Sequence, residues 1–259
     1  MLEDKHLKVV YYTQKSDQVF PNTDIKGGIA VTYRDIDKHY EAIETFTAFE
    51  ELMEMYKLVL HRSDFKSLSD YVFAPESYKL TEKLPQDFPL AETVLSKGHK
   101  FDVTTNIFDK LPEVFINNKL NQDFVKIIGR QNNERVVRYI YKGYIKGPDN
   151  FYKYKVLLPK ANGSGAIGEV LSTPLVGHTQ TFLSIGSFDT EYEANSLLKY
   201  IKTPFARTLL GVLKITQDNK KSDVPRDKSI EEIHNYLCNK YQYTDEHKAF
   251  MESHVSKMN

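Results

Sequence analysis

The sequence predicts a mixed α/β fold in which most of the strands precede most of the helices. Segments rich in β-branched and aromatic residues, which are typical of strands, occur before residue 186 of the 259. From residue 190 onward, apolar residues recur at helical spacing instead. Hydrophobic residues make up 41% of the chain, enough for a buried core. The expected fold class is therefore α+β.

The N-terminal part is predicted to be a hairpin followed by a helix. Residues 7–12 and 29–33 have the composition of strands, and a glycine pair between them marks a turn. Apolar residues at helical spacing predict an amphipathic helix over 46–61. Four prolines interrupt residues 62–125, so we expect irregular structure with short strands and a domain boundary there.

Further strands, and then helices, are predicted downstream. The polar triplet Gln131-Asn132-Asn133 predicts a hairpin turn between the first two of these strands. A capping box, in which Ser or Thr is followed three residues later by Glu, marks the first and third helices. The predicted strands cover residues 124–129, 135–145, 151–159 and 181–185, and the predicted helices begin at Thr190, Pro204, Ser229 and Thr244, the last running to Met258.

Charge is unevenly distributed, although the chain has 35 basic and 35 acidic residues. Residues 1–56 hold six Lys or Arg and eleven acids, a net charge of −5. Residues 126–160 hold nine Lys or Arg and two acids, a net charge of +7, interleaved with aromatic residues. Such a cation density suits contacts with DNA phosphates. A strand pair with aromatic residues inward and lysines in water has the same composition, so both interpretations stay open.

Other motifs are weaker. Residues 163–168 (GSGAIG) fit the dinucleotide-binding pattern, but Pro174 ends the helix that must follow, so a contact loop is the preferred interpretation. His247 and His254 are too far apart in sequence for a zinc helix, and one cysteine excludes an intramolecular disulfide. We therefore expect no metal site. Since neither a membrane span nor an export signal is recognisable, we expect a cytoplasmic protein without membrane association.

Four segments, taken in order, carry a family resemblance. They are Val19–Gly28, Tyr154–Gly165, Tyr200–Gln217 and Ile233–Met258. The first resembles the late methyltransferase segment of adenine-specific DNA methyltransferases from bacterial restriction–modification systems. The second and third are similar to the TaqI-like C-terminal specificity domain of these enzymes and to the two helices that end this domain. The fourth is similar to the helical pair at the C-terminus of these enzymes. The resemblance spans nearly the whole chain and is weakest at 60–120.

Two motifs of that family are missing. Neither the Phe-x-Gly-x-Gly cofactor loop nor the catalytic Asn-Pro-Pro-Tyr occurs in the chain. In the family both lie upstream of the segment that contains Phe20, so we expect this chain to begin near the end of a catalytic domain. Whether it is a piece of a longer protein or a natural truncated or split subunit stays open. The resemblance implies that S-adenosylmethionine binds to the full-length enzyme, that no cofactor binds to this chain, and that the missing methyltransferase catalytic half is a partner.

The resemblance also implies a division of the chain into three parts. Residues 1–61 would be a remnant hairpin and helix of the methyltransferase sheet, residues 62–220 a β-rich target-recognition domain, and residues 221–259 a C-terminal helical extension. The implied function is sequence-specific recognition of double-stranded DNA for an enzyme that methylates adenine. Alone, the chain is expected to be inactive.

The predicted DNA site combines this resemblance with residue chemistry. In the family, the phenylalanine that matches Phe20 stacks on the base flipped out of the duplex; a core aromatic at a turn is the alternative. Base reading is assigned to Arg130, Gln131, Asn132 and Asn133, whose side chains can pair with base edges. Contacts with the DNA backbone or groove are assigned to Arg135, Arg138, Lys142, Lys146, Lys160, Asn162 and Ser164.

Two other functions remain open from the sequence. A magnesium-dependent nuclease subunit would use Asp189, Glu191 and Glu193, although acids at the start of a helix explain these residues more simply. A protein-interaction module would present the last two helices to a partner and show no salt-sensitive affinity for DNA.

Overall fold

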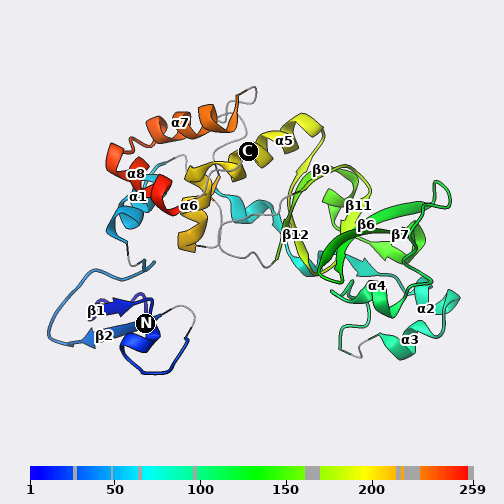
Figure 1. The fold of residues 1–259 in the computed structure, drawn as a ribbon, viewed down its shortest axis with the longest axis horizontal. Coiled ribbons are helices and arrows are strands. Elements are labelled where there is room, and N and C mark those ends of the chain that lie inside the picture. The colour runs from blue at the N-terminus through cyan, green and yellow to red at the C-terminus, as the bar shows by residue number, and fades with distance from the viewer. Residues whose placement is uncertain are drawn as a thin grey trace.

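The chain has the mixed α/β fold that its sequence predicts, with small sheets and longer helices in different regions. Figure 1 shows an N-terminal hairpin, a group of helices and a lobe that contains most of the strands. The computed structural model describes residues 1–25, 28–47, 49–63, 66–95, 98–160, 170–213, 217–218 and 228–255.

The N-terminal hairpin pairs β1 (Leu7–Thr13) with β2 (Ile29–Arg34) in a two-stranded antiparallel sheet. A 3-10 turn, Ser16–Gln18, opens the long connection between the strands. Both predicted strands are thus confirmed. Of the strand residues, only Leu7 and Thr13 are buried, and neither outer edge pairs with another strand of the described chain.

Helix α1 (Glu50–Leu60) begins later than the predicted start at residue 46. Phe49 has an extended backbone (φ −107°, ψ 120°), and Phe46 packs on Tyr12 of β1 with ring centroids 5.3 Å apart. The aromatic residue at 46 has helical spacing, but its contact with the hairpin holds it outside the helix. The predicted helix is therefore correct in its position and wrong in its first turn.

The strand-rich lobe is built from two sheets that pack through Ile128, Leu157, Val176 and Phe182. In the three-stranded sheet, β11 runs parallel to β6, and β6 pairs antiparallel with β7. This sheet has the order β11 (Val176–His178), β6 (Phe124–Gln131), β7 (Glu134–Tyr141). The other sheet has the order β10 (Val170–Ser172), β9 (Tyr154–Pro159), β12 (Phe182–Phe188), β4 (Val72–Phe73).

Two predicted strands are shorter than expected. The strand over 135–145 ends at Tyr141, because Thr81 holds the following residues in a 3-10 turn: its hydroxyl donates to the carbonyl of Gly143 (2.7 Å) and its N–H to that of Tyr144 (2.9 Å). The strand over 151–159 begins at Tyr154, since another 3-10 turn occupies Asp149–Tyr152. The chain between these turns contributes β8 (Ile145–Lys146), which pairs with β5 (Lys79–Leu80).

Short elements cover the other face of the β11-β6-β7 sheet. Tyr78, Ile107 and Phe108 pack there on Ile127 and Ile140. The sequence predicts irregular structure in this region, and short helices of one or two turns are too brief to produce a periodic signal. They are α2 (Lys83–Asp87), α3 (Ala91–Val94) and α4 (Ile107–Lys110), with 3-10 turns at Leu68–Tyr71 and Pro75–Ser77.

All four predicted C-terminal helices are present. Thr190 accepts a hydrogen bond from the backbone of Glu193, and Ser229 and Glu232 form a complete capping box. The predicted end of the last helix at Met258 lies outside the described residues. The helices are α5 (Glu191–Lys202), α6 (Pro204–Leu213), α7 (Ile230–Lys240) and α8 (Asp245–His254).

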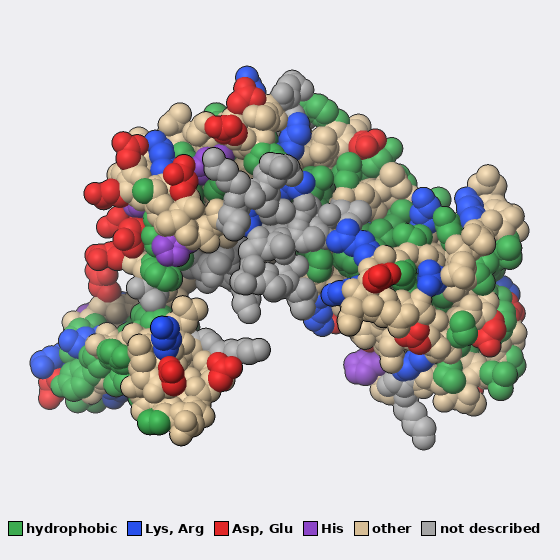
Figure 2. All heavy atoms as spheres, viewed as in Figure 1, with side chains coloured by type: hydrophobic (Ala, Val, Ile, Leu, Met, Phe, Trp, Pro, Cys, Tyr) green, Lys and Arg blue, Asp and Glu red, His purple; other side chains and the backbone are tan. Residues whose placement is uncertain are grey.

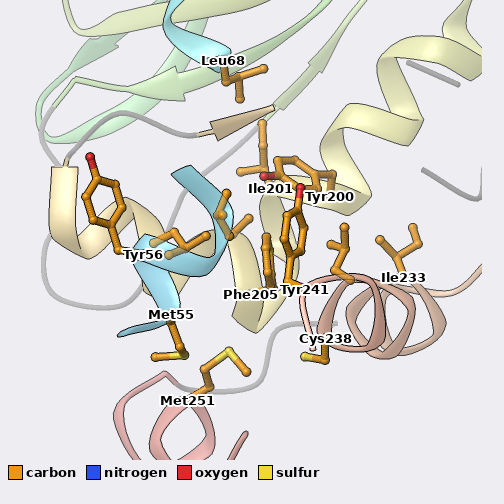
Figure 3. Close-up of a cluster of buried hydrophobic side chains, with 14 of the residues drawn as sticks. Met55, Tyr56, Leu68, Tyr200, Ile201, Phe205, Ile233, Cys238, Tyr241 and Met251 are labelled. Atoms are coloured by element: carbon orange, nitrogen blue, oxygen red, sulfur yellow. The ribbon is translucent and has the colours of Figure 1, made fainter. Parts of the chain in front are cut away.

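Helix α1 shares a core with these late helices. Figure 3 shows Met55 of α1 near Met251 of α8, with Phe205 and Tyr241 in the same cluster. The rings of Phe205 and Tyr241 stack at 5.2 Å. A short pair, β3 (Lys66–Ser67) with β13 (Gln217–Asp218), joins the same early and late parts of the chain. None of the helices in the described part of the chain is long and apolar enough to cross a membrane.

Candidate nucleic-acid interface

The turn of the β6–β7 hairpin carries the four residues predicted to read bases. Asn132 and Asn133 form its two-residue loop, with φ angles of +52° and +63°. Positive φ at both central residues defines a type I′ turn, whose twist matches that of the flanking strands. Asparagine enters this left-handed region at less cost than most residues. The two asparagines therefore have a structural reason to be at this turn, independent of any contact with DNA.

Hydrogen bonds order the residues on either side of the turn. Arg130 donates from Nη2 to the carbonyl of Asn133 (2.6 Å), and Gln131 donates from Nε2 to the carboxylate of Asp109 (2.6 Å). Gln131 Oε1 accepts from the guanidinium of Arg138. The side chains of Asn132 and Asn133 are exposed and make no hydrogen bond with other described residues. The tip thus presents two free amide groups on an ordered base.

Close packing fixes the base of this hairpin. Val125, Ile127 and Ile140 are buried in the core beneath the sheet. At Gly129 a Cβ would lie 2.5 Å from the ring of Phe108, so only glycine allows this approach. Figure 1 shows the turn between β6 and β7 projecting beyond the rest of the lobe.

Of the nine cations in residues 126–160, one is buried and three form ion pairs with other described residues. One of them, Lys155, is fully buried, so the expectation that it adds to a surface charge is wrong. The local charge of +7 is also partly balanced by carboxylates from other parts of the sequence. The ion pairs are Lys142–Asp123 (2.6 Å), Lys160–Glu76 (3.5 Å) and Lys153–Asp189.

Three of the remaining cations lie on one face of the hairpin. Lys126 and Arg130 are four residues apart in β6, and Arg130 is directly opposite Arg135 in β7. The side chains of all three therefore leave the sheet on the same side. Lys126 is exposed and forms no ion pair with any described residue. The guanidinium of Arg135 lies 5.7 Å from the ring centroid of Phe182.

The other predicted cations are more scattered. On the opposite face of β7, the guanidinium of Arg138 lies 5.8 Å from the ring centroid of Phe108. Lys146 is exposed in β8, directly opposite Lys79 of β5, and forms no ion pair in the described structure. The structure thus brings Arg130 to Arg135 together at one hairpin, while Lys142, Lys146 and Lys160 lie on separate elements.

A fully buried polar network lies beneath the hairpin. The ammonium of Lys155 donates to two backbone carbonyls (2.8 and 3.2 Å). Asn150 accepts from the hydroxyl of Tyr78 (3.1 Å) and donates to Ser184 Oγ (2.9 Å), which also lies 3.3 Å from Nε2 of His178. These side chains join β9, β11 and β12. Because all five are inaccessible to solvent, no substrate reaches them, and the network is part of the scaffold.

Burial sets the protonation of this network. It lowers the pKa of Lys155 to about 7 and that of His178 to about 4, and it raises the pKa of the Tyr78 hydroxyl. His178 is therefore neutral at pH 7, which lowers the cost of keeping it beside Lys155. Sequence reasoning missed the network; the available signal was a lysine within the otherwise apolar strand at 154–159.

The remaining predicted contacts are not gathered at the hairpin. Phe20 is 51% exposed in the β1–β2 connection, where its N–H donates to the carbonyl of Ser16 (2.8 Å). Figure 1 shows that hairpin far from β6 and β7. Asn162 and Ser164 lie outside the described residues. Since Phe20 is not a core residue in this chain, its alternative interpretation as a core aromatic is wrong.

The acids considered for a nuclease are engaged at a helix start. Asp189 pairs with Lys153, and Glu191 and Glu193 occupy the first turn of α5, where acids interact favourably with the helix dipole. Among the described residues, no cluster of three or more His, Cys, Asp or Glu side chains is arranged to hold a metal ion.

Charge is segregated over the surface, and the acidic surface combines acids of the predicted N-terminal segment with acids of α8. Figure 2 shows Asp and Glu side chains gathered over α1 and α8, whereas Lys and Arg are more frequent on the lobe of β6 and β7. A polyanion would therefore be repelled by the first surface and attracted to the second. The acids of the first surface are Glu50, Glu51, Glu54, Asp245, Glu246 and Glu252.

Comparison of the chain with family models, curated proteins and solved structures found no match.

Proposed function

We propose that this chain is the DNA-recognition part of an adenine-specific restriction–modification methyltransferase and lacks the methyl-transfer chemistry itself. The observation that carries the proposal is the β6–β7 hairpin, which combines an ordered, projecting turn with free amides and a cationic face. A two-stranded β-ribbon fits the major groove of B-DNA, where amide and guanidinium groups can pair with base edges. The sequence resemblance supplies the class of enzyme.

In this proposal the roles of the side chains follow from their positions. Asn132 and Asn133 at the tip read bases, while Arg130 and Gln131 support them and reach the flanking pairs. Lys126 and Arg135, on the cationic face, contact phosphates along the groove. Lys142 and Lys160 exchange their exposed carboxylate partners for phosphates, a small cost because surface ion pairs contribute little.

The N-terminal hairpin is proposed to meet the missing methyltransferase half, which would bind S-adenosylmethionine. Nine of the 23 large hydrophobic side chains that are exposed in the described chain belong to residues 1–36. An open edge on both β1 and β2 can accept a further strand from that partner. Phe20 would then face the catalytic pocket, at the other end of the molecule from the reading hairpin.

The test begins with selection from a randomised DNA duplex library, because the target sequence is unknown. The enriched duplex and a scrambled one are then titrated at two salt concentrations. Asn132→Ala should cost about 1–3 kcal/mol on the enriched duplex and little on the scrambled one. Lys126→Ala and Lys146→Ala should weaken binding to both duplexes and reduce the slope of log affinity against log salt concentration by about one.

Lys248→Ala is the matched control, because Lys248 is a partly exposed lysine on α8 at the acidic surface. It should leave affinity and salt slope unchanged. If no duplex is enriched, or if all variants bind both duplexes like the parent, DNA reading by this hairpin is refuted.

A protein-interaction module is the second candidate, and the exposed apolar side chains of β1 and β2 favour it. In that case Val10→Lys or Val31→Lys would abolish capture of the partner, while DNA affinity would not fall with salt. The two functions are separable, because the hairpin variants of β6–β7 test only the first.

A further inference from the structure

A second site lies at the end of the β6–β7 hairpin opposite to the turn. A cavity of about 530 Å³ opens there between the start of β6, the end of β7, helix α2 and residues 113–120. Its volume is in the range of small-molecule clefts, which is about 300–1,000 Å³. None of the roles proposed above uses this cavity.

One wall of the cavity is a continuous row of four aromatic rings. Phe88 contacts Tyr144, Tyr144 contacts Tyr141, and Tyr141 contacts Phe124, with centroids 5.8, 5.1 and 6.3 Å apart. Their interplanar angles of 87°, 73° and 63° are edge-to-face, so ring faces with negative potential are presented in several directions. Leu120, 70% exposed at the rim, adds apolar surface.

The charged groups of the lining are two carboxylates and one ammonium. Lys83 pairs with Asp87 Oδ2 (2.8 Å), and the hydroxyl of Tyr144 donates to the same oxygen (2.8 Å). These two partners hold the pKa of Asp87 below its usual value, so it stays anionic. Glu113 is exposed and forms no ion pair within the described structure. The cavity therefore has a net negative charge and one carboxylate without a partner.

We propose that this cavity binds an organic cation, an alkylammonium or guanidinium group on an apolar stem. Such a group is carried by a free polyamine or by a Lys or Arg side chain of a peptide. The ring faces attract the cation, Glu113 pairs with it, and the apolar residues cover the stem. A nucleotide is disfavoured, because its phosphate would meet Asp87 and Glu113.

The site is separate from the proposed base-reading turn, whereas Lys142, a proposed phosphate contact, directly follows Tyr141 of the cavity lining. Tyr141 is seven residues along β7 from Glu134. At a strand rise of about 3.4 Å per residue, the cavity and the turn are separated by roughly 24 Å. A cationic ligand can therefore bind at one end of the hairpin while the turn at the other end reads bases.

The test is a titration of the full chain, followed by NMR, with spermidine, with acetyl-Gly-Lys-Gly-amide and with its norleucine analogue. Norleucine has the same apolar stem without the charge, so the lysine peptide should bind about fivefold or more tightly than it. The ratio of spermidine to lysine-peptide affinity distinguishes a free polyamine from a peptide source. Equal binding of the lysine and norleucine peptides, tighter binding of AMP, or no binding of any probe would overturn the proposal.

Two variants locate the binding. Glu113→Gln and Phe124→Leu should each weaken the binding of the cationic probes by about threefold or more. Glu134→Gln is the matched control, because it removes an exposed carboxylate from the other end of β7. Thermal unfolding of each variant checks that the fold is retained. If Glu113→Gln binds the probes like the parent, the cation binds elsewhere and the assignment fails.

Discussion

The two hairpins of this protein have similar strand compositions and opposite surroundings. The β6–β7 hairpin closes through a two-residue type I′ turn, pairs with a third strand and has buried side chains on both of its faces. The β1–β2 hairpin has a long connection, a register shift between Val9 and Tyr11, and no third strand in the described chain. Val10 and Tyr11 are 51% and 47% exposed there.

This difference teaches what a hairpin needs in order to serve as a binding surface. A two-stranded sheet alone is marginally stable in water. The β6–β7 hairpin is stabilised by the core beneath it and, at Ile128, by the second sheet, which leaves its tip and the exposed cations beside it available for a ligand. The β1–β2 hairpin exposes apolar side chains instead, which is typical of a surface that a protein partner covers.

The largest expected difference is in local stability. Amides of β6 and β7 should exchange only when the lobe unfolds, whereas those of β1 and β2 should exchange through local opening. We expect protection factors to differ by about 1,000-fold, equivalent to about 4 kcal/mol. Hydrogen exchange measured at two protein concentrations checks this. Equal protection that rises with concentration would mean that a second copy covers the N-terminal hairpin.

Core truncation should show the next largest contrast. Ile127→Ala removes a fully buried side chain beneath β6 and should destabilise the protein by about 3 kcal/mol. Val31→Ala in β2 removes a side chain that is 44% exposed and should cost about 0.5 kcal/mol or less. Urea denaturation of both variants measures the contrast. Similar losses would show that the N-terminal hairpin is buried in solution.

Strand β11, which pairs with β6, makes the stability of the lobe sensitive to acid. Burial is the main cause that lowers the pKa of His178 in β11, to about 4 from 6.5. As the pH falls, the unfolded chain therefore takes up the proton before the folded chain does. The stability that depends on neutral His178 is present above pH 6.5 and is lost as the pH falls toward 4. Between pH 6.5 and 5 the loss should be about 2 kcal/mol. His178→Gln should flatten this dependence in denaturation curves; an unchanged slope would assign it to other groups.

The smallest contrast concerns two asparagines with positive φ. Asn133→Ala should cost about 1 kcal/mol, because alanine has a Cβ and no polar side chain to favour the left-handed conformation (φ +63°). Asn133→Gly should be neutral or stabilising. Asn22→Ala, at φ +65° in the β1–β2 connection, should leave global unfolding unchanged. Thermal denaturation compares the three, and an equal loss at Asn22 would contradict the proposed independence of the N-terminal hairpin.

Much of the fold was predictable because its signals are local. The turn at residues 132–133, the caps at Ser229 and Thr244 and the proline at 204 act through neighbouring backbone groups, so their residue types identify them without tertiary information. The position of the last strands before the C-terminal helices also follows from periodicity alone. The position of the candidate reading residues at a hairpin tip was predictable for the same reason.

The site itself was only partly predictable. The sequence shows nine cations in residues 126–160, but it does not show that Glu76 and Asp189 approach two of them or that Lys155 is buried. The cavity lined by aromatic rings could not be predicted from the sequence either, since Phe88 lies far in sequence from the strand residues that complete the lining. Such features depend on which distant segments meet.

The sequence by itself determined the fold class, the turn chemistry, the starts of the C-terminal helices and the presence of a basic strand pair. Tertiary structure alone decided that Phe46 leaves helix α1, that one hairpin has a covered face while the other does not, and which charges remain available to a ligand. The physical reason is the range of the interactions. Caps and turns act over a few residues, whereas burial and ion pairing depend on contacts between residues that the sequence separates by tens to hundreds of positions.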